Sequence, residues 1–415
     1  MLGARCLRGR RGRSHRRSAL ICSRIGGHAP QPSVRRYPSV VALIFHSSPS
    51  SSVGVELELG LVDLSTGELV GAASEIIDEL AAPFGGKHPK VKQELFESTI
   101  EICTEVHATV AQARADLEKS VAELQQAAAR RGLGIVGGGL HPYSKWHDLT
   151  RSSGERYDSL AERVAWPVRR MMAHGMHVHV GVRSPEKSIL IMNALSDCLP
   201  LLLALSASSP YWHGLDTGLA STRTKVFDVM PNSGLAPLLV DWREFTSLHD
   251  RLLTTGSIEM GKDIRWDVRP RPEFGTVELR MFDAPPTLSE VAALAALSQC
   301  LVQRFDQIID SGYELPIPSD WVRQENKWRA ARWGVDADMI IDDEGHTRAF
   351  REVITDLVEE LAPTAEGLQC TAELGDILAI MESGPSYVRQ RAILDRGGDL
   401  LDVVLGLRNE MLADS

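Results

Sequence analysis

Four short segments of the chain alternate apolar residues with polar or ionisable residues at every second position. These segments are Val53–Leu61, Glu97–Cys103, Met176–Val182 and Val277–Asp283. Successive side chains of a β-strand point to opposite faces, so each segment is predicted to form a strand with one apolar and one ionisable face. Antiparallel sheets that bury a single face commonly show this alternation.

Apolar residues spaced three and four apart predict helices between these strands. The predicted helices cover Val106–Arg131, Arg156–Ala173, Glu186–Ser206, the stretch from the Thr287-Leu-Ser-Glu290 capping box to about Gly312, and much of the last 90 residues. Turn signals interrupt the last region at Asp343–Gly345 and Ser383–Pro385. Because strands and helices interleave, the sequence predicts an α/β (α+β) fold.

Composition narrows the class of protein. A chain of 415 residues with 43% hydrophobic content can bury a core large enough for an enzyme. The most apolar segment, Ile189–Ala207, contains Asn193, Asp197 and Pro200, which favours a buried helix over a membrane span. The six cysteines form no C-x-x-C pair, so neither a zinc ribbon nor a disulfide scaffold is indicated, and a reducing cytoplasm fits best.

Charge is distributed unevenly along the chain. The first 55 residues contribute +10 through ten arginines and no acidic residue, and the total is −10, so the remainder carries −20. Residues 1–52, rich in Arg and Ser, are predicted to be a disordered basic extension preceding a catalytic domain at 53–415. The extension could be a targeting segment or the result of an upstream start codon. The acidic remainder argues against nucleic acid as a partner.

The ionisable faces of the four strands carry the candidate chemistry. Their side chains are Glu56 and Glu58, Glu97 and Glu101, His177 and His179, and Glu278 and Arg280. Residues i and i+2 on a strand lie about 6.5–7 Å apart, so one sheet face could bring several carboxylates and imidazoles to the same ions. Mg²⁺ prefers oxygen ligands, and imidazole also suits Mn²⁺. Each pair taken alone equally fits a solvated sheet face.

Seven blocks of the sequence, in order, resemble the type 2 glutamate-cysteine ligase (carboxylate-amine ligase) family of the glutamine synthetase-like superfamily. They are GVELELGLVD, ELFESTIEICTEV, GGGLHPYSKW, GMHVHVGV, LLALSASSPYWHGLDTGLASTR, WDVRPRPEFGTVELRMFD and ENKWRAARWG, and the resemblance covers about residues 53–410. It implies a curved, mostly antiparallel sheet that carries the metal and ATP site, with helices packed behind it.

The resemblance also implies roles for individual residues. The metal ligands would be Glu56, Glu58, Glu101, His177 and Glu278, with Glu97 as a weaker candidate. His179 and Arg280 would lie at the ATP phosphates, with Arg280 as the catalytic residue. Arg223 and Arg269 would hold the acid substrate or a phosphate, because a guanidinium can bind either group with two hydrogen bonds.

The activity that the resemblance implies is ATP-dependent formation of an amide through an acyl phosphate, with glutamate and cysteine as the family's usual acid and amine. ATP and Mg²⁺ or Mn²⁺ are therefore the expected cofactors, and small molecules the expected partners, in a possible homodimer. Three alternatives stay open: a ligase for another acid and amine, a metallohydrolase using the same Glu and His residues, and a binding protein that acts through its basic arm.

Two further motifs are weaker signals. In ENKWRAARWG, Trp328 and Trp333 are predicted to be packing residues, and Asn326 and Arg329 are candidates for ligand contact. The glycines of GGGLHP are not followed by G-K-[ST], which excludes a P-loop. The serines of LALSASSP lack the G-x-S-x-G elbow of serine hydrolases.

Overall fold

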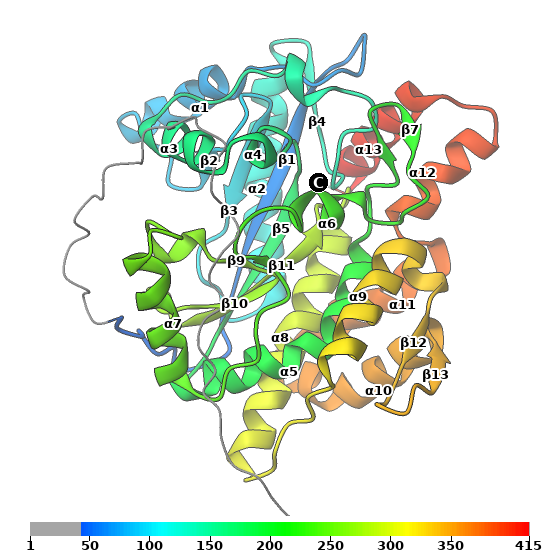
Figure 1. Ribbon diagram of the computed structural model, residues 1–415. Helices are drawn as coiled ribbons and strands as arrows, with labels where there is room; N and C mark the ends of the chain where they lie inside the picture. The colour runs from blue at the N-terminus through cyan, green and yellow to red at the C-terminus, as the bar shows by residue number, and fades with distance from the viewer. Residues whose placement is uncertain (1–42, 415) are drawn as a thin grey trace, which may run out of the picture. The chain divides into compact units, whose positions relative to one another are not determined.

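A single antiparallel sheet organises the protein, and the computed structural model describes residues 43–414 of it (Figure 1). In spatial order its strands are β10 (Val268–Arg271), β11 (Thr276–Asp283), β5 (Gly175–Gly181), β1 (Val53–Asp63), β3 (Thr99–Cys103) and β2 (Val91–Gln93). A further strand, β4 (Leu133–Val136), pairs with the end of β1. All pairings in this sheet are antiparallel, and the four predicted strands are confirmed.

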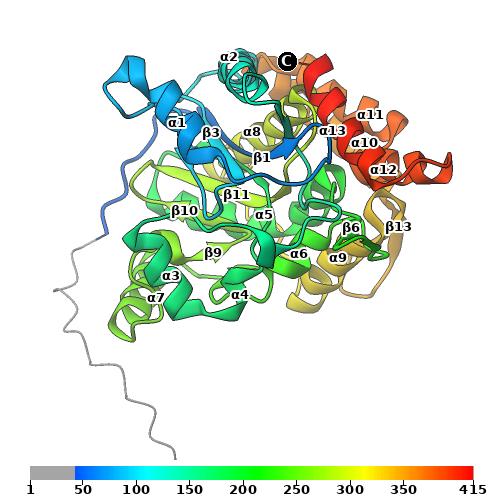
Figure 2. The same cartoon turned by 90° about the horizontal axis from the view of Figure 1, so that it is seen from above.

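Helices cover both faces of the sheet, and Figure 2 shows α2 and α8 on one side with α3, α4 and α6 on the other. The helices are α1 (Ala73–Ala81), α2 (Val110–Ala129), α3 (Glu155–Val164), α4 (Trp166–Arg169), α5 (Pro185–Ser206), α6 (Thr222–Phe227), α7 (Trp242–Thr254), α8 (Leu288–Asp310), α9 (Asp320–Trp333), α10 (Phe350–Leu368), α11 (Thr371–Ser383), α12 (Ser386–Asp395) and α13 (Leu400–Ala413). Short strand pairs join β6 (Tyr211–Trp212) to β7 (Leu215–Asp216), β8 (Ser233–Gly234) to β9 (Arg265–Trp266), and β12 (Asp338–Ile340) to β13 (Thr347–Ala349).

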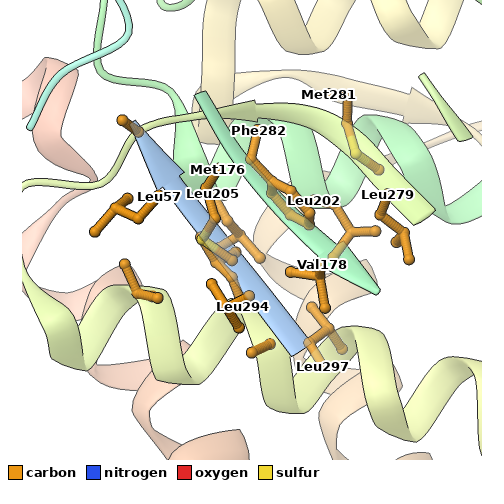
Figure 3. Close-up of a cluster of buried hydrophobic side chains, with 14 of the residues drawn as sticks. Leu57, Met176, Val178, Leu202, Leu205, Leu279, Met281, Phe282, Leu294 and Leu297 are labelled. Atoms are coloured by element: carbon orange, nitrogen blue, oxygen red, sulfur yellow. The ribbon is translucent and has the colours of Figure 1, made fainter. Parts of the chain in front are cut away.

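The apolar face of the sheet packs against α5 and α8. In Figure 3, Leu57 of β1 and Val178 of β5 lie among side chains that include Leu202 of α5 and Leu294 of α8. These four side chains are fully buried. At about 25 cal/mol per Å² of buried apolar surface, this layer is a main source of stability, and it fixes the direction of the opposite, ionisable face.

Helix α5 is apolar and long enough to cross a membrane, but 89% of its apolar window is buried inside the protein. It packs against α8, α9 and β11. The predicted buried helix is therefore confirmed.

Two predicted helices differ from the observed ones, the first at its start and the second by a break in its interior. The helix predicted from Val106 begins at Val110, because Thr109 and Gln112 form a capping box there and Val106 is exposed. The helix predicted over Arg156–Ala173 is divided into α3 and α4 at Ala165, which has a φ of 58°. Pro167 follows two residues later and cannot donate to a continuing helix.

Residues 43–52 have no regular secondary structure, yet they contact the sheet. His46 N donates to the carbonyl of Pro272 at 2.8 Å, and Ser48 N donates to that of Val182 at 3.0 Å. Phe45 packs edge-on against Trp242, with ring centroids 5.5 Å apart. The part of the predicted extension before residue 43 lies outside the described residues, and the domain boundary at residue 52 stays a prediction.

Candidate metal and phosphate site

Strand register brings the predicted ionisable residues together on the face of the sheet opposite α5 and α8. Glu56 of β1 stands opposite His177 of β5, and Glu58 of β1 stands opposite Glu101 of β3. His179 of β5 stands opposite Glu278 of β11. The sequence placed these residues on strand faces, and the pairing of the strands places them in one site.

Glu56 lies at the centre of this group. Its Oε2 is 2.8 Å from His177 Nδ1, and its Oε1 is 3.4 Å from His179 Nε2. His179 Nδ1 is 3.0 Å from the hydroxyl of Thr276, which leaves Nε2 directed toward Glu56 and toward Glu278 Oε1 at 3.8 Å. His179 Nε2 is buried and makes no well-directed hydrogen bond, so it is free to act as a ligand.

Glu278 is fully buried and surrounded by three arginines. Arg269 Nε lies 2.7 Å and Arg271 Nη1 2.9 Å from Glu278 Oε2, and Arg280 Nη1 donates to Oε1. Burial alone raises the pKa of Glu278, but the arginine charges reverse this effect and hold the pKa well below its ordinary value. Glu278 is therefore a carboxylate at neutral pH.

A second, acidic group lies beside the first. Burial and neighbouring acids raise the pKa of Glu101 to about 8, and burial raises that of Glu58 to about 7. Glu94 was not predicted from the sequence; burial and the charge of Glu58 raise its pKa to about 7. Cys103, which lies close to Glu56 and Glu101, was not predicted either. Glu94 follows β2 in a loop, where no alternation marks it, although it stands in one of the blocks that carry the family resemblance.

These donor atoms fit divalent cations. Three groups have ligand atoms within 4.8 Å of one another, namely Glu56 with His179 and Glu278, Glu58 with Glu101 and His177, and Glu56 with Glu101 and Cys103. Burial, then the charge of Arg280, lowers the pKa of His177 to about 4, so its imidazole is neutral and can bind a metal. Carboxylates that repel one another in a buried site are stabilised by a cation between them.

A β-bulge sets the position of Arg280. Leu279 pairs with Val178 and Phe282 pairs with Met176, so two residues of β11, Arg280 and Met281, stand opposite His177 alone. The guanidinium of Arg280 is mostly buried, with Nη1 3.4 Å from His177 Nδ1. The bulge thus places a cationic group directly beside the candidate metal ligands, a detail that simple alternation does not predict.

Arg223 reaches the same region from α6. Its side chain is 2% exposed and lies directly beneath Gly175, where a Cβ atom would be 2.2 Å from Arg223 Nη2. The buried carboxylate of Asp283 holds the surrounding loops, because it accepts hydrogen bonds from Ser209 Oγ at 2.7 Å and Ser221 Oγ at 2.8 Å. Through these serines, Asp283 positions Arg223. Asp283 was not predicted from the sequence to have this role.

Arg269, which was predicted to hold substrate, is occupied elsewhere. Besides Glu278, it donates to the carbonyls of Lys262 and Ile264, and it is 3% exposed. The geometry therefore assigns Arg269 to the support of Glu278, and its role in substrate binding stays an untested prediction.

Other weaker candidates also lie apart from the site. Glu97 accepts hydrogen bonds from Ser74 and Gln93 and belongs to none of the three ligand groups. Asn326 bonds the backbone of Ile340, and Arg329 bonds Glu325. The predicted packing residues Trp328 and Trp333 are 40% and 44% exposed.

Comparison with known proteins identifies the family. Residues 52–406 match the model of "Glutamate-cysteine ligase family 2(GCS2)". The chain belongs to this family. A Frankia alni protein provisionally named glutamate–cysteine ligase 2-1 is 51% identical over 369 residues, which is 88% of this chain and 97% of that protein. A Thermobifida fusca protein, provisionally named glutamate–cysteine ligase 2, is 47% identical over 370 residues, covering 89% of this chain and 93% of the relative.

Two solved structures share the fold of this GCS2 protein. The glutamate–cysteine ligase of Francisella tularensis, solved with AMP, has a TM-score of 0.65 at 12% identity, covering 88% of this chain and 90% of that one. A bifunctional glutathione synthetase of Pasteurella multocida has a TM-score of 0.60 at 16% identity, covering 87% and 52%. The expected fold class is confirmed. Family membership and this fold together show that the chain is an ATP-dependent ligase that forms C–N bonds.

Proposed function

We propose that this ligase joins the γ-carboxyl group of L-glutamate to the amino group of L-cysteine, with ATP converted to ADP and phosphate. One observation carries the proposal most directly. A buried group of carboxylates and imidazoles on one sheet face stands beside Arg280, which approaches His177 to 3.4 Å. Family membership and the provisional names of close relatives support the choice of glutamate and cysteine.

The reaction has two steps. The substrate carboxylate attacks the γ-phosphorus of ATP, forming an acyl phosphate and releasing ADP. The neutral amine then attacks the acyl carbon, phosphate leaves, and the amine loses a proton. Arg280 offsets the negative charge that develops on the transferred phosphoryl group, since its planar guanidinium can contact two oxygens at once.

Other residues of the chain prepare this site. Glu56, Glu58, Glu101, His177 and Glu278 would bind Mg²⁺ or Mn²⁺. When bound, these cations would supply positive charge that neutralises the ATP phosphates and orients them for in-line transfer. His179 would lie at the phosphates, and Arg223, held beneath Gly175, would bind the carboxylate of the acid substrate. Burial of these groups keeps water away from the acyl phosphate.

Two alternatives differ in substrate or chemistry. A ligase for another acid and amine would use the same residues for phosphoryl transfer, since these would contact the phosphates and not the variable parts of the substrates. A metallohydrolase would use the Glu and His residues to activate water, but the buried arginines Arg223 and Arg280 suit an anionic, phosphorylated substrate better. We therefore place the hydrolase last.

The wider setting is also a proposal. We infer a cytoplasmic enzyme whose partners are small molecules, with no nucleic acid or membrane partner and a possible homodimeric state. The acidic balance of the chain after residue 55 supports the exclusion of nucleic acid.

Product analysis tests the function. The protein is incubated with ATP, Mg²⁺ and a matrix of acids and amines, and products are identified by mass spectrometry while ADP is measured in parallel. Formation of γ-glutamylcysteine with stoichiometric ADP, dependent on both glutamate and cysteine, is the expected result. Formation of a different amide would contradict the proposed substrates but keep the reaction class. Hydrolysis of a substrate without consumption of ATP would refute the ligase mechanism for this chain.

A further inference from the structure

Lys327 is a buried lysine that the proposed reaction leaves unexplained. It lies on α9, in the ENKWRAARWG block, and is 5% exposed. Its Nζ is 2.8 Å from Asp228 Oδ1 and 2.8 Å from Asp267 Oδ2. Burial alone lowers the pKa of Lys327, but the two carboxylates reverse this and raise it, so the ammonium group stays charged.

Asp267 connects this lysine to the reaction site. Its backbone carbonyl accepts a hydrogen bond from Arg280 N at 2.7 Å, at the β-bulge that positions Arg280. Its side chain lines a narrow pocket together with Arg223, Arg265 and Arg280. Burial lowers the pKa of the Arg223 guanidinium, and Asp267 is one of the acids, after Asp283 and Glu58, that oppose this shift.

The location of Asp267 creates an electrostatic problem. The Asp267 side chain is only 13% exposed, and a carboxylate so largely buried is costly without a counter-ion; a guanidinium would be its best partner. Without Lys327, Asp267 would be drawn into ion pairs with Arg223 or Arg280, and their donors would no longer be available to a substrate anion. With Lys327 present, Asp267 is already neutralised at 2.8 Å.

We propose that Lys327 is a positioning residue that neutralises Asp267, and thereby keeps Arg223 and Arg280 available for the carboxylate and phosphoryl groups of the substrates. The inference rests on the proposed function of Arg280. The two ion pairs of Lys327 connect three separate parts of the chain. These are α9, which carries Lys327, the segment after α6, which carries Asp228, and the segment before β10, which carries Asp267.

Steady-state kinetics of Lys327→Met tests this role. The expected result is a fall of about 10²-fold in kcat/KM for the acid, comparable to the loss of one preorganised donor. The Kd for ATP should change by less than about threefold, since the metal ligands are intact. Lys327→Arg should retain activity within about tenfold of the natural chain, because it preserves the charge. The double variant Lys327→Met/Asp267→Asn should have a kcat/KM for the acid at least about tenfold higher than Lys327→Met alone, because the neutral amide needs no counter-ion.

Lys187 offers a control away from the site. It also lies between two aspartates, with Nζ 2.7 Å from Asp306 Oδ1 and a second contact to Asp310, and Arg183 contacts both aspartates as well. Lys187→Met should leave kcat/KM within about threefold, whatever its effect on Tm. A normal kcat/KM in Lys327→Met, or an equal loss in Lys187→Met, would overturn the proposal. If Lys327→Met does not fold, a folded but inactive Lys327→Met/Asp267→Asn protein would overturn it.

The two proposals fail in different ways. Absence of product from the natural chain with glutamate and cysteine contradicts the proposed substrates only. The Lys327 comparison then uses whichever acid supports turnover, with calorimetric binding of that acid as a second measurement. Unchanged acid binding and turnover in Lys327→Met contradict the positioning role alone.

Discussion

Arg269 and Glu278 form a bidentate ion pair, here called the fork, in which Arg269 Nε lies 2.7 Å from Glu278 Oε2 and Nη2 lies 3.2 Å from Oε1. The two residues stand opposite each other on β10 and β11. The fork fixes the position of the carboxylate, and Arg269, Arg280 and Arg271 together keep it ionised against the effect of burial.

The first prediction concerns this fork. Arg269→Lys keeps the charge but loses the planar geometry, so the Mg²⁺ concentration for half-maximal activity should rise about tenfold or more, as for other residues that orient a metal ligand. Mg²⁺ titration of activity measures the effect. The exposed Arg243→Lys serves as control, and identical titrations for both variants would show that the fork has no such role.

Arg280 should contribute chiefly to the phosphoryl-transfer step. Arg280→Lys is expected to lower kcat by about 10²-fold, or about 2.7 kcal/mol of transition-state stabilisation, while ATP binding changes much less. The residue is mostly buried and ion-paired with Glu278, which excludes a simple surface salt bridge. Steady-state kinetics combined with a thermal melt separates catalysis from stability. A kcat close to normal would remove Arg280 from the mechanism.

His177 should be a metal ligand. His177→Ala is expected to weaken the dependence of activity on Mg²⁺ or Mn²⁺ while the Tm of the metal-free protein changes little. The imidazole is neutral at pH 7, because burial and Arg280 lower its pKa to about 4, and Nδ1 already contacts Glu56 at 2.8 Å. Metal titration and differential scanning calorimetry measure the two effects. A large loss of Tm with an unchanged titration would instead indicate a structural histidine.

The N-terminal extension can be tested by truncation. The sequence predicts that residues 1–52 are dispensable, but His46 and Ser48 bond the residues that follow β10 and β5, and Phe45 packs against α7. A chain beginning at Leu43 should keep its Tm and activity. A chain beginning at Ser51 should lose several degrees of Tm, since about 1 kcal/mol corresponds to a few degrees in a domain of this size. Equal melting curves for the two truncated chains would instead support the domain boundary predicted at residue 52.

Acid stability should depend on His141, a buried residue away from the sheet's polar face. Its Nε2 lies 2.8 Å from the carbonyl of Gly67 and its Nδ1 accepts from Ser144 N at 3.0 Å, so the folded state holds the neutral form. Burial lowers its pKa to about 3. Between pH 6.5 and 3 the unfolded state binds the proton and the folded state does not, so stability falls as pH falls.

His141 alone is expected to lower the free energy of unfolding by about 1.4 kcal/mol for each pH unit below its unfolded-state pKa. Urea unfolding at pH 7.5, 6.5 and 5.5 measures it, in the natural chain and in His141→Asn, whose amide oxygen can replace Nδ1. The difference between the two free energies of unfolding should shrink toward pH 5.5. Parallel curves would mean that His141 does not contribute to acid sensitivity.

The sequence by itself determined the local features of this protein. A period of two fixes which side chains share a strand face, so Glu56 and Glu58, His177 and His179 could be assigned to ionisable faces without a structure. The Thr287-Leu-Ser-Glu290 capping box likewise fixed the start of α8, since Thr287 and Glu290 interact within one turn. The order of seven blocks indicated the family.

The tertiary structure alone decided which faces meet and which charges pair. Strand order and register brought Glu278 opposite His179, and a bulge, which no alternation predicts, aimed Arg280 at His177. Arg269 and Lys327 took supporting roles because their partners, Glu278 and Asp267, were set by packing between strands and helices distant in sequence. Such pairings depend on long-range contacts among many segments, whereas periodicity depends only on neighbours along the chain.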